Sequence, residues 1–121
     1  MDIALWVAAG LLAALYLVVG LVKLGRGRAL RRRMPWTEDF PDPVIRLIGV
    51  AEIAGAIGVV VPWATDRTPV LTPWAAVGLA VLQALAIVVH VRRRETSQLG
   101  INVALLLLAA FVAVGRFAGW G

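Results

Sequence analysis

The stretch that decides the fold is residues 44–61, which read VIRLIGVAEIAGAIGVVV. Apart from Arg46 and Glu52 it contains only apolar residues and glycine, and it stops before Pro62. A helix needs about 20 residues of this kind to cross the hydrocarbon layer of a bilayer. The regular alternation of apolar and polar residues that is typical of membrane β-strands is missing. We therefore predict a transmembrane helix over 44–61.

Three further apolar runs of similar length complete the chain, and they cover residues 3–24, 73–91 and 99–118. Of the 121 residues, 61% are hydrophobic, which is more than a soluble domain of this size can bury. Short connections make consecutive helices antiparallel neighbours. The sequence thus predicts an all-α fold, a single domain over 1–121 built as an antiparallel bundle of four transmembrane helices. We expect a multi-pass membrane protein that lies in the bacterial plasma membrane.

Basic residues indicate how the bundle is oriented. The chain has twelve Lys and Arg against seven Asp and Glu, a net charge of +5. Most of the bases lie between the first two helices or directly after the third, and the positive-inside rule places these connections in the cytoplasm and both termini outside. Tryptophans lie at the predicted outer helix ends, as in an interfacial aromatic belt. The inner bases are Lys23, Arg26, Arg28, Arg31, Arg32, Arg33, Arg46, Arg92, Arg93 and Arg94, and the outer tryptophans are Trp6, Trp63, Trp74 and Trp120.

The Arg-rich inner connection also indicates a partner. Residues 25–33 can form a short basic helix on the inner leaflet, where arginines contact anionic lipid headgroups. No aromatic or groove-reading module accompanies the positive charge, so nucleic-acid binding is not expected. The chain has no cysteine, which excludes disulfides, thiolate metal sites and a cysteine nucleophile within it.

Polar residues inside the predicted spans mark a candidate site. On each helix they share one face, and such faces turn into the bundle because exposure to lipid is costly. At 1.5 Å per residue, Tyr16, Glu52 and Gln83 lie about 12 Å from the cytoplasmic helix ends. A second layer nearer the cytoplasm contains Lys23, Arg46, His90 and Asn102. We predict a polar pocket that opens toward the cytoplasm, and the candidate ligand-binding residues are Tyr16, Lys23, Glu52, Gln83, His90 and Asn102.

Glu52 has two interpretations, which the sequence leaves open. It is either a structural group hydrogen-bonded to Tyr16 or Gln83, or a candidate catalytic acid/base and ligand anchor. His90 and Lys23 also have structural interpretations. His90 lies near the membrane surface, where histidine is common, and Lys23 can extend toward the headgroups. As the sole histidine, His90 cannot form a metal site alone, so no metal is expected.

The order of these residues resembles a known family. Gly20-x-x-Lys23-Leu24 ends the first helix, Ile48-Gly49-Val50-x-Glu52-x-x-Gly55-Ala56-x-Gly58 forms the second before Pro62, and Ala86-x-x-x-His90-x-Arg92-Arg93-x-Glu95 ends the third. This set is similar to the DoxX-like family of small four-helix membrane proteins. The resemblance implies membrane redox or oxidative-stress systems, including thiosulfate:quinone oxidoreduction, and in distant relatives the assembly of other membrane proteins. Lys23, Glu52 and His90 match the family's recurring polar positions.

Three functions remain open at this stage. The first is the binding of a quinone-like or other amphipathic molecule by Tyr16, Glu52 and Gln83, where a redox role requires a quinone or a partner subunit. The second is a non-catalytic assembly factor or partner subunit, and small-residue helix faces also permit a homodimer. The third is an acid/base enzyme for a lipophilic substrate, with Glu52 facing Tyr16 or His90. No serine triad or phosphate-binding loop is present, so whether the protein is an enzyme stays open.

Overall fold

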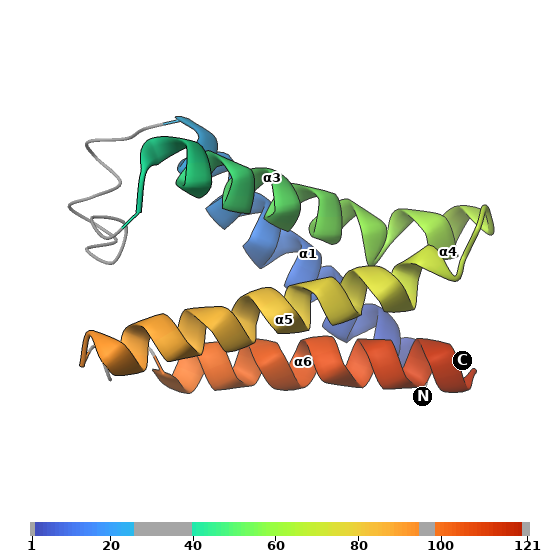
Figure 1. Ribbon diagram of the computed structural model, residues 1–121. Helices are drawn as coiled ribbons and strands as arrows, with labels where there is room; N and C mark the ends of the chain where they lie inside the picture. The colour runs from blue at the N-terminus through green and yellow to red at the C-terminus, as the bar shows by residue number, and fades with distance from the viewer. Residues whose placement is uncertain (1, 26–39, 95–98, 120–121) are drawn as a thin grey trace.

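The computed structural model describes residues 2–25, 40–94 and 99–119, and this part of the chain is helical, without strands (Figure 1). Four helical stretches are long and apolar enough to cross a membrane, which confirms the predicted all-α fold with four spans. The helices are α1 (Asp2–Gly25), α3 (Asp42–Gly58), the short α4 (Val61–Thr65), α5 (Leu71–Arg92) and α6 (Leu99–Ala118).

Two helix pairs form the bundle. α5 packs along α6 (Figure 1). The C-terminal part of α1 packs on α3, and the N-terminal part of α1 reaches α6. Both chain ends lie at the same end of the bundle, which we call the termini end. From there, α3 and α5 diverge toward the opposite end, which we call the loop end. The membrane side that each end faces remains a prediction.

The second span differs from its predicted form. α3 ends at Gly58 and the chain resumes as α4, so the span runs from Pro43 to Thr65 and does not end before Pro62. Proline has no backbone N–H to bond the carbonyl four residues earlier, and its ring crowds that carbonyl. The carbonyl is that of Gly58, and it accepts a hydrogen bond of 2.9 Å from the Thr72 hydroxyl of α5 instead. Pro62 therefore breaks the helix inside the span, and α5 repairs the break.

The apolar core lies mainly in the half of the bundle nearer the termini end. Small and aliphatic side chains from all four spans meet there, while large aliphatic side chains such as Ile3, Leu47 and Leu107 are exposed on the outside. An outer surface of this kind suits lipid, which is as apolar as the side chains themselves. The core comprises Ala8, Ala9, Leu12, Tyr16, Ala56, Val59, Ala76, Leu79, Ala109, Val112 and Ala113.

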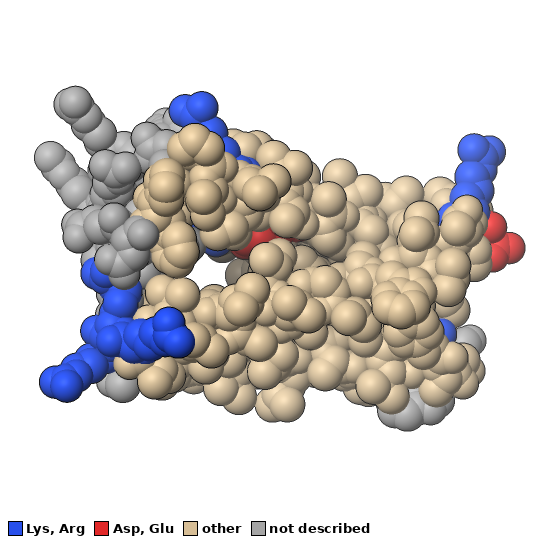
Figure 2. Space-filling model, viewed as in Figure 1, with Lys and Arg blue, Asp and Glu red and all other residues tan. Residues whose placement is uncertain are grey.

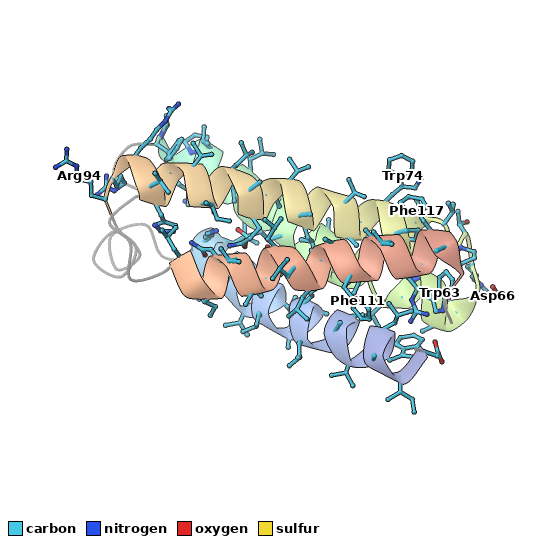
Figure 3. The ribbon with its side chains drawn as sticks, turned by 90° about the horizontal axis from the view of Figure 1, so that it is seen from below. Trp63, Asp66, Trp74, Arg94, Phe111 and Phe117 are labelled. Carbon is cyan, nitrogen blue, oxygen red and sulfur yellow. The ribbon has the colours of Figure 1, made fainter. Side chains whose placement is uncertain are left out.

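Aromatic side chains gather at the termini end. Trp63, Trp74 and Phe117 lie there together, opposite Arg94 at the loop end (Figure 3). The rings of Trp74 and Phe117 meet edge to face with their centroids 5.3 Å apart. This grouping is typical of an interfacial aromatic belt. The predicted basic helix over 25–33 and Trp120 fall in segments outside the described residues, apart from Gly25, the last residue of α1.

Candidate functional site: a polar cluster between the helix pairs

Three buried polar side chains form a continuous hydrogen-bonded chain across the bundle. The Tyr16 hydroxyl of α1 donates to Gln83 Oε1 of α5 at 2.7 Å, and also lies 3.3 Å from the Leu79 carbonyl. Gln83 Nε2 donates to Asn102 Oδ1 of α6 at 2.8 Å. Because α1 belongs to one helix pair and α5 and α6 to the other, this chain joins the two pairs inside the apolar interior.

The chain ends in an unsatisfied donor. Asn102 is 7% exposed, and its Nδ2 has no hydrogen-bond acceptor among the described residues. An amide carries two N–H donors, and a buried donor without a partner costs about 1–3 kcal/mol. Native proteins rarely keep a buried donor without an acceptor. A bound molecule that supplies the acceptor would explain the unsatisfied Asn102 amide.

An ion pair lies next to this chain on α1 and α3. Lys23 Nζ donates to Glu52 Oε1, and the two side chains are 9% and 4% exposed. Glu52 also lies within electrostatic range of the Tyr16 hydroxyl. The predicted structural hydrogen bond from Glu52 to Tyr16 or Gln83 is therefore replaced by a bond to Lys23. Lys23 turns inward and does not extend toward the headgroups, because a buried carboxylate offers it a stronger partner.

The remaining predicted residues divide between the interior and the surface. His90 is buried in the last turn of α5 and Arg46 is exposed on α3. Asn102 bonds Gln83 and so lies in the layer of Tyr16, not in the predicted second layer. The depth estimate counted residues along each helix separately and could not show which side chains of α5 and α6 meet.

The molecular surface has an opening between the helix pairs. In the view of Figure 1, the surface is hollowed between α3 and α5 toward the loop end, and acidic atoms are visible at the edge of the hollow (Figure 2). Beyond its first turn, α3 contains one acidic residue, Glu52. Glu52 bonds Lys23 of α1, so this ion pair holds α1 and α3 together.

The donor set indicates which ligands the cluster fits. It offers amide, hydroxyl, ammonium and carboxylate groups, which hydrogen-bond an oxygen-bearing head group. Within the described ranges, no three His, Cys, Asp or Glu side chains gather as a metal ion would require. An organic ligand with a polar head and an apolar body matches this arrangement best.

Comparison with known proteins adds the family. The model of the DoxX-like family matches residues 7–112, which is most of the chain. The chain belongs to the DoxX-like family. No curated protein and no solved structure gives a significant match.

Two of the sequence segments that resemble the family meet in the structure of this DoxX-like protein. Gly20 of α1 and Gly49 of α3 lie against each other's backbone, and Lys23 and Glu52, each three residues further along, form the ion pair. The Gly-x-x-Lys and Gly-x-x-Glu segments thus form one unit, in which the glycines bring the backbones together and the charges meet one turn away.

Sequence reasoning missed the role of one buried arginine in this DoxX-like protein. Arg116 of α6 bonds Asp2 and contacts the rings of Trp6 and Trp63 at the termini end. Its position on the polar face of 99–118, together with two tryptophans expected at the same membrane surface, was the available signal. The charge count used Arg116 only to orient the bundle, whereas in the structure aromatic rings and Asp2 allow its burial.

Proposed function

We propose that this DoxX-like membrane protein binds an amphipathic small molecule, of the quinone type, in the polar cluster between its helix pairs. The unsatisfied Asn102 Nδ2 is the single observation that carries this proposal. Each carbonyl oxygen of a quinone can accept a hydrogen bond and carries no net charge. A buried amide donor in an apolar interior needs an acceptor of this kind.

The remaining geometry supports the same reading. The chain from Tyr16 through Gln83 fixes the orientation of the Asn102 amide, so its free N–H is held in place before a ligand arrives. Preorganised donors of this kind lower the cost of binding. The opening between α3 and α5 gives an apolar molecule a route from the bilayer (Figure 2).

A place in a membrane redox or stress-response system follows from the ligand class. A quinone supplies electron transfer through its own ring, while the protein supplies binding and protons. Glu52 is the candidate acid/base because its carboxylate is buried beside Lys23. The chain contains no cysteine and so no thiol electron donor of its own, and in this proposal a partner subunit delivers the electrons.

Replacing Asn102 by Leu is expected to weaken the binding of a short-chain benzoquinone by about tenfold, the value of one hydrogen bond between ligand and protein. Binding is measured on the purified protein in maltoside micelles, by equilibrium dialysis and by the quinone-dependent rise of the unfolding temperature. We expect the Asn102→Leu variant to fold and to bind the benzoquinone more weakly than the wild type does.

Thr72→Val is the matched control. It also removes one buried hydrogen bond, that to the Gly58 carbonyl, but at a distance from the cluster. It should lower stability and leave quinone affinity unchanged. Equal affinities for the wild type and Asn102→Leu would contradict the proposal. In that case crosslinking in membranes that recovers a stoichiometric protein partner would favour the assembly or partner-subunit function.

A further inference from the structure

Arg116 forms a second polar centre, separate from the cluster of Tyr16, Gln83 and Asn102. It lies in the last turn of α6, and its side chain is 1% exposed. The guanidinium carbon lies 5.0 Å from the ring centroid of Trp6 and 4.4 Å from that of Trp63. Nη1 donates to Asp2 Oδ1 at 3.1 Å. Arg116 thus connects α6 to the start of α1 and to α4.

The hydrogen-bonding capacity of this guanidinium is only partly used. Its Nε is buried and has no acceptor in the part of the chain that the structure describes. The edge formed by Nε and a terminal nitrogen is one that binds two oxygens of a carboxylate or phosphate side by side. Asp2 bonds Nη1 through a single oxygen and leaves Nε without a partner.

The position of this centre indicates where an oxyanion would come from. Arg116 is near the end of its span, and Asp2 is the first residue of α1 with a side chain 53% exposed. The guanidinium therefore lies one side chain beneath the surface, at the level of the aromatic belt. In a membrane this level is occupied by phospholipid headgroups, whose phosphates carry the required oxygens.

We propose that Arg116 binds a phosphate-type oxyanion, supplied by a phospholipid headgroup of the leaflet at the termini end. The headgroup enters on the side of Asp2, whose carboxylate competes for the same cation. The Trp6 and Trp63 rings both contact the guanidinium and stabilise its charge below the surface. This site is independent of the ligand proposed for the polar cluster.

The test uses the full chain in maltoside micelles, which contain no phosphate. Phosphatidylglycerol, inorganic phosphate and the phosphate-free lipid galactosyl diacylglycerol are added separately, and bound lipid is counted by native mass spectrometry while unfolding temperature is recorded. Arg116→Lys keeps the charge but loses the planar edge, and it should weaken phosphatidylglycerol binding about tenfold. Asp2→Asn removes the competing carboxylate, and it should strengthen that binding. Arg67→Gln, at an exposed arginine between α4 and α5, is the matched control and should change neither.

The arms separate the sources of the oxyanion. A response to phosphatidylglycerol alone supports the headgroup as ligand, and a response to inorganic phosphate supports the same oxyanion site with a free ion. An equal response to galactosyl diacylglycerol would overturn the proposal, because that lipid has no oxyanion. If Arg116→Lys does not fold, Asp2→Asn decides: unchanged or weaker phosphatidylglycerol binding in that variant would also overturn it.

Discussion

Glu52→Ala is expected to lower the free energy of unfolding by about 3–5 kcal/mol, the largest effect among the substitutions considered. The substitution removes the carboxylate that bonds the Lys23 ammonium inside the bundle. Removing one partner of a buried ion pair costs more than the pair contributes, because the carboxylate no longer balances the desolvation of the ammonium. Unfolding by a denaturing detergent in maltoside micelles measures the change.

A double-mutant cycle separates this cause from simple loss of packing. Lys23→Met combined with Glu52→Ala removes both charges, so the double variant should be more stable than Glu52→Ala alone. Arg46→Ala is the matched control, since Arg46 is a charged residue of the same helix but is exposed. Additive losses for Lys23→Met and Glu52→Ala would show that the two side chains do not interact.

Gly49→Ala is expected to destabilise the protein by about 1–3 kcal/mol, the usual cost of forcing extra volume into a packed interface. A methyl group on Gly49 would lie 2.9 Å from the Gly20 carbonyl oxygen and 3.1 Å from Lys23 Cβ. A methyl group on Gly20 would likewise lie 2.8 Å from the Gly49 carbonyl oxygen. Since backbone atoms cannot rotate away as side chains do, α1 and α3 must separate. Unfolding in maltoside micelles measures the loss.

Gly10→Ala and Gly78→Ala are controls with the same chemical change. Neither methyl group would meet an atom within 4 Å, so these variants should be as stable as the wild type or slightly more stable, since alanine favours helix. Separation of α1 and α3 also moves Lys23 away from Glu52. Gly49→Ala should therefore lower stability less in the Lys23→Met/Glu52→Ala double variant than in the wild type. The same stability for Gly49→Ala and Gly10→Ala would show that the close crossing is absent.

The sequence predicts the spans well because their signal is local. Apolar length alone marks each helix, and α6 occupies the 99–118 run that composition indicates. The second span is the exception: Pro62 was interpreted as its end, whereas the helix breaks and resumes. A proline predicts a local break but not whether a neighbouring helix repairs it, and here Thr72, 14 residues away in the chain, does so.

The burial of the polar side chains was predictable from the sequence, but their pairings were not. A single sequence shows that Tyr16, Glu52, Gln83 and Asn102 belong inside, because polar groups avoid lipid. It does not show which of them meet, since pairing depends on how the helices tilt and cross. The Gly20–Gly49 contact decides that Lys23 reaches Glu52, and the bonds of Gln83 bring Asn102 into its layer.

Photolabelling tests most directly whether the cluster between the helix pairs is a ligand site. An azido-substituted benzoquinone with an isoprenoid tail is activated in membranes that contain the protein, and the labelled residues are identified by mass spectrometry. We predict that the label concentrates on α5 and α6 around Gln83 and Asn102, and that Asn102→Leu reduces it. Label confined to outward-facing residues such as Val81 and Leu107, and unchanged in Asn102→Leu, would contradict the proposed ligand site.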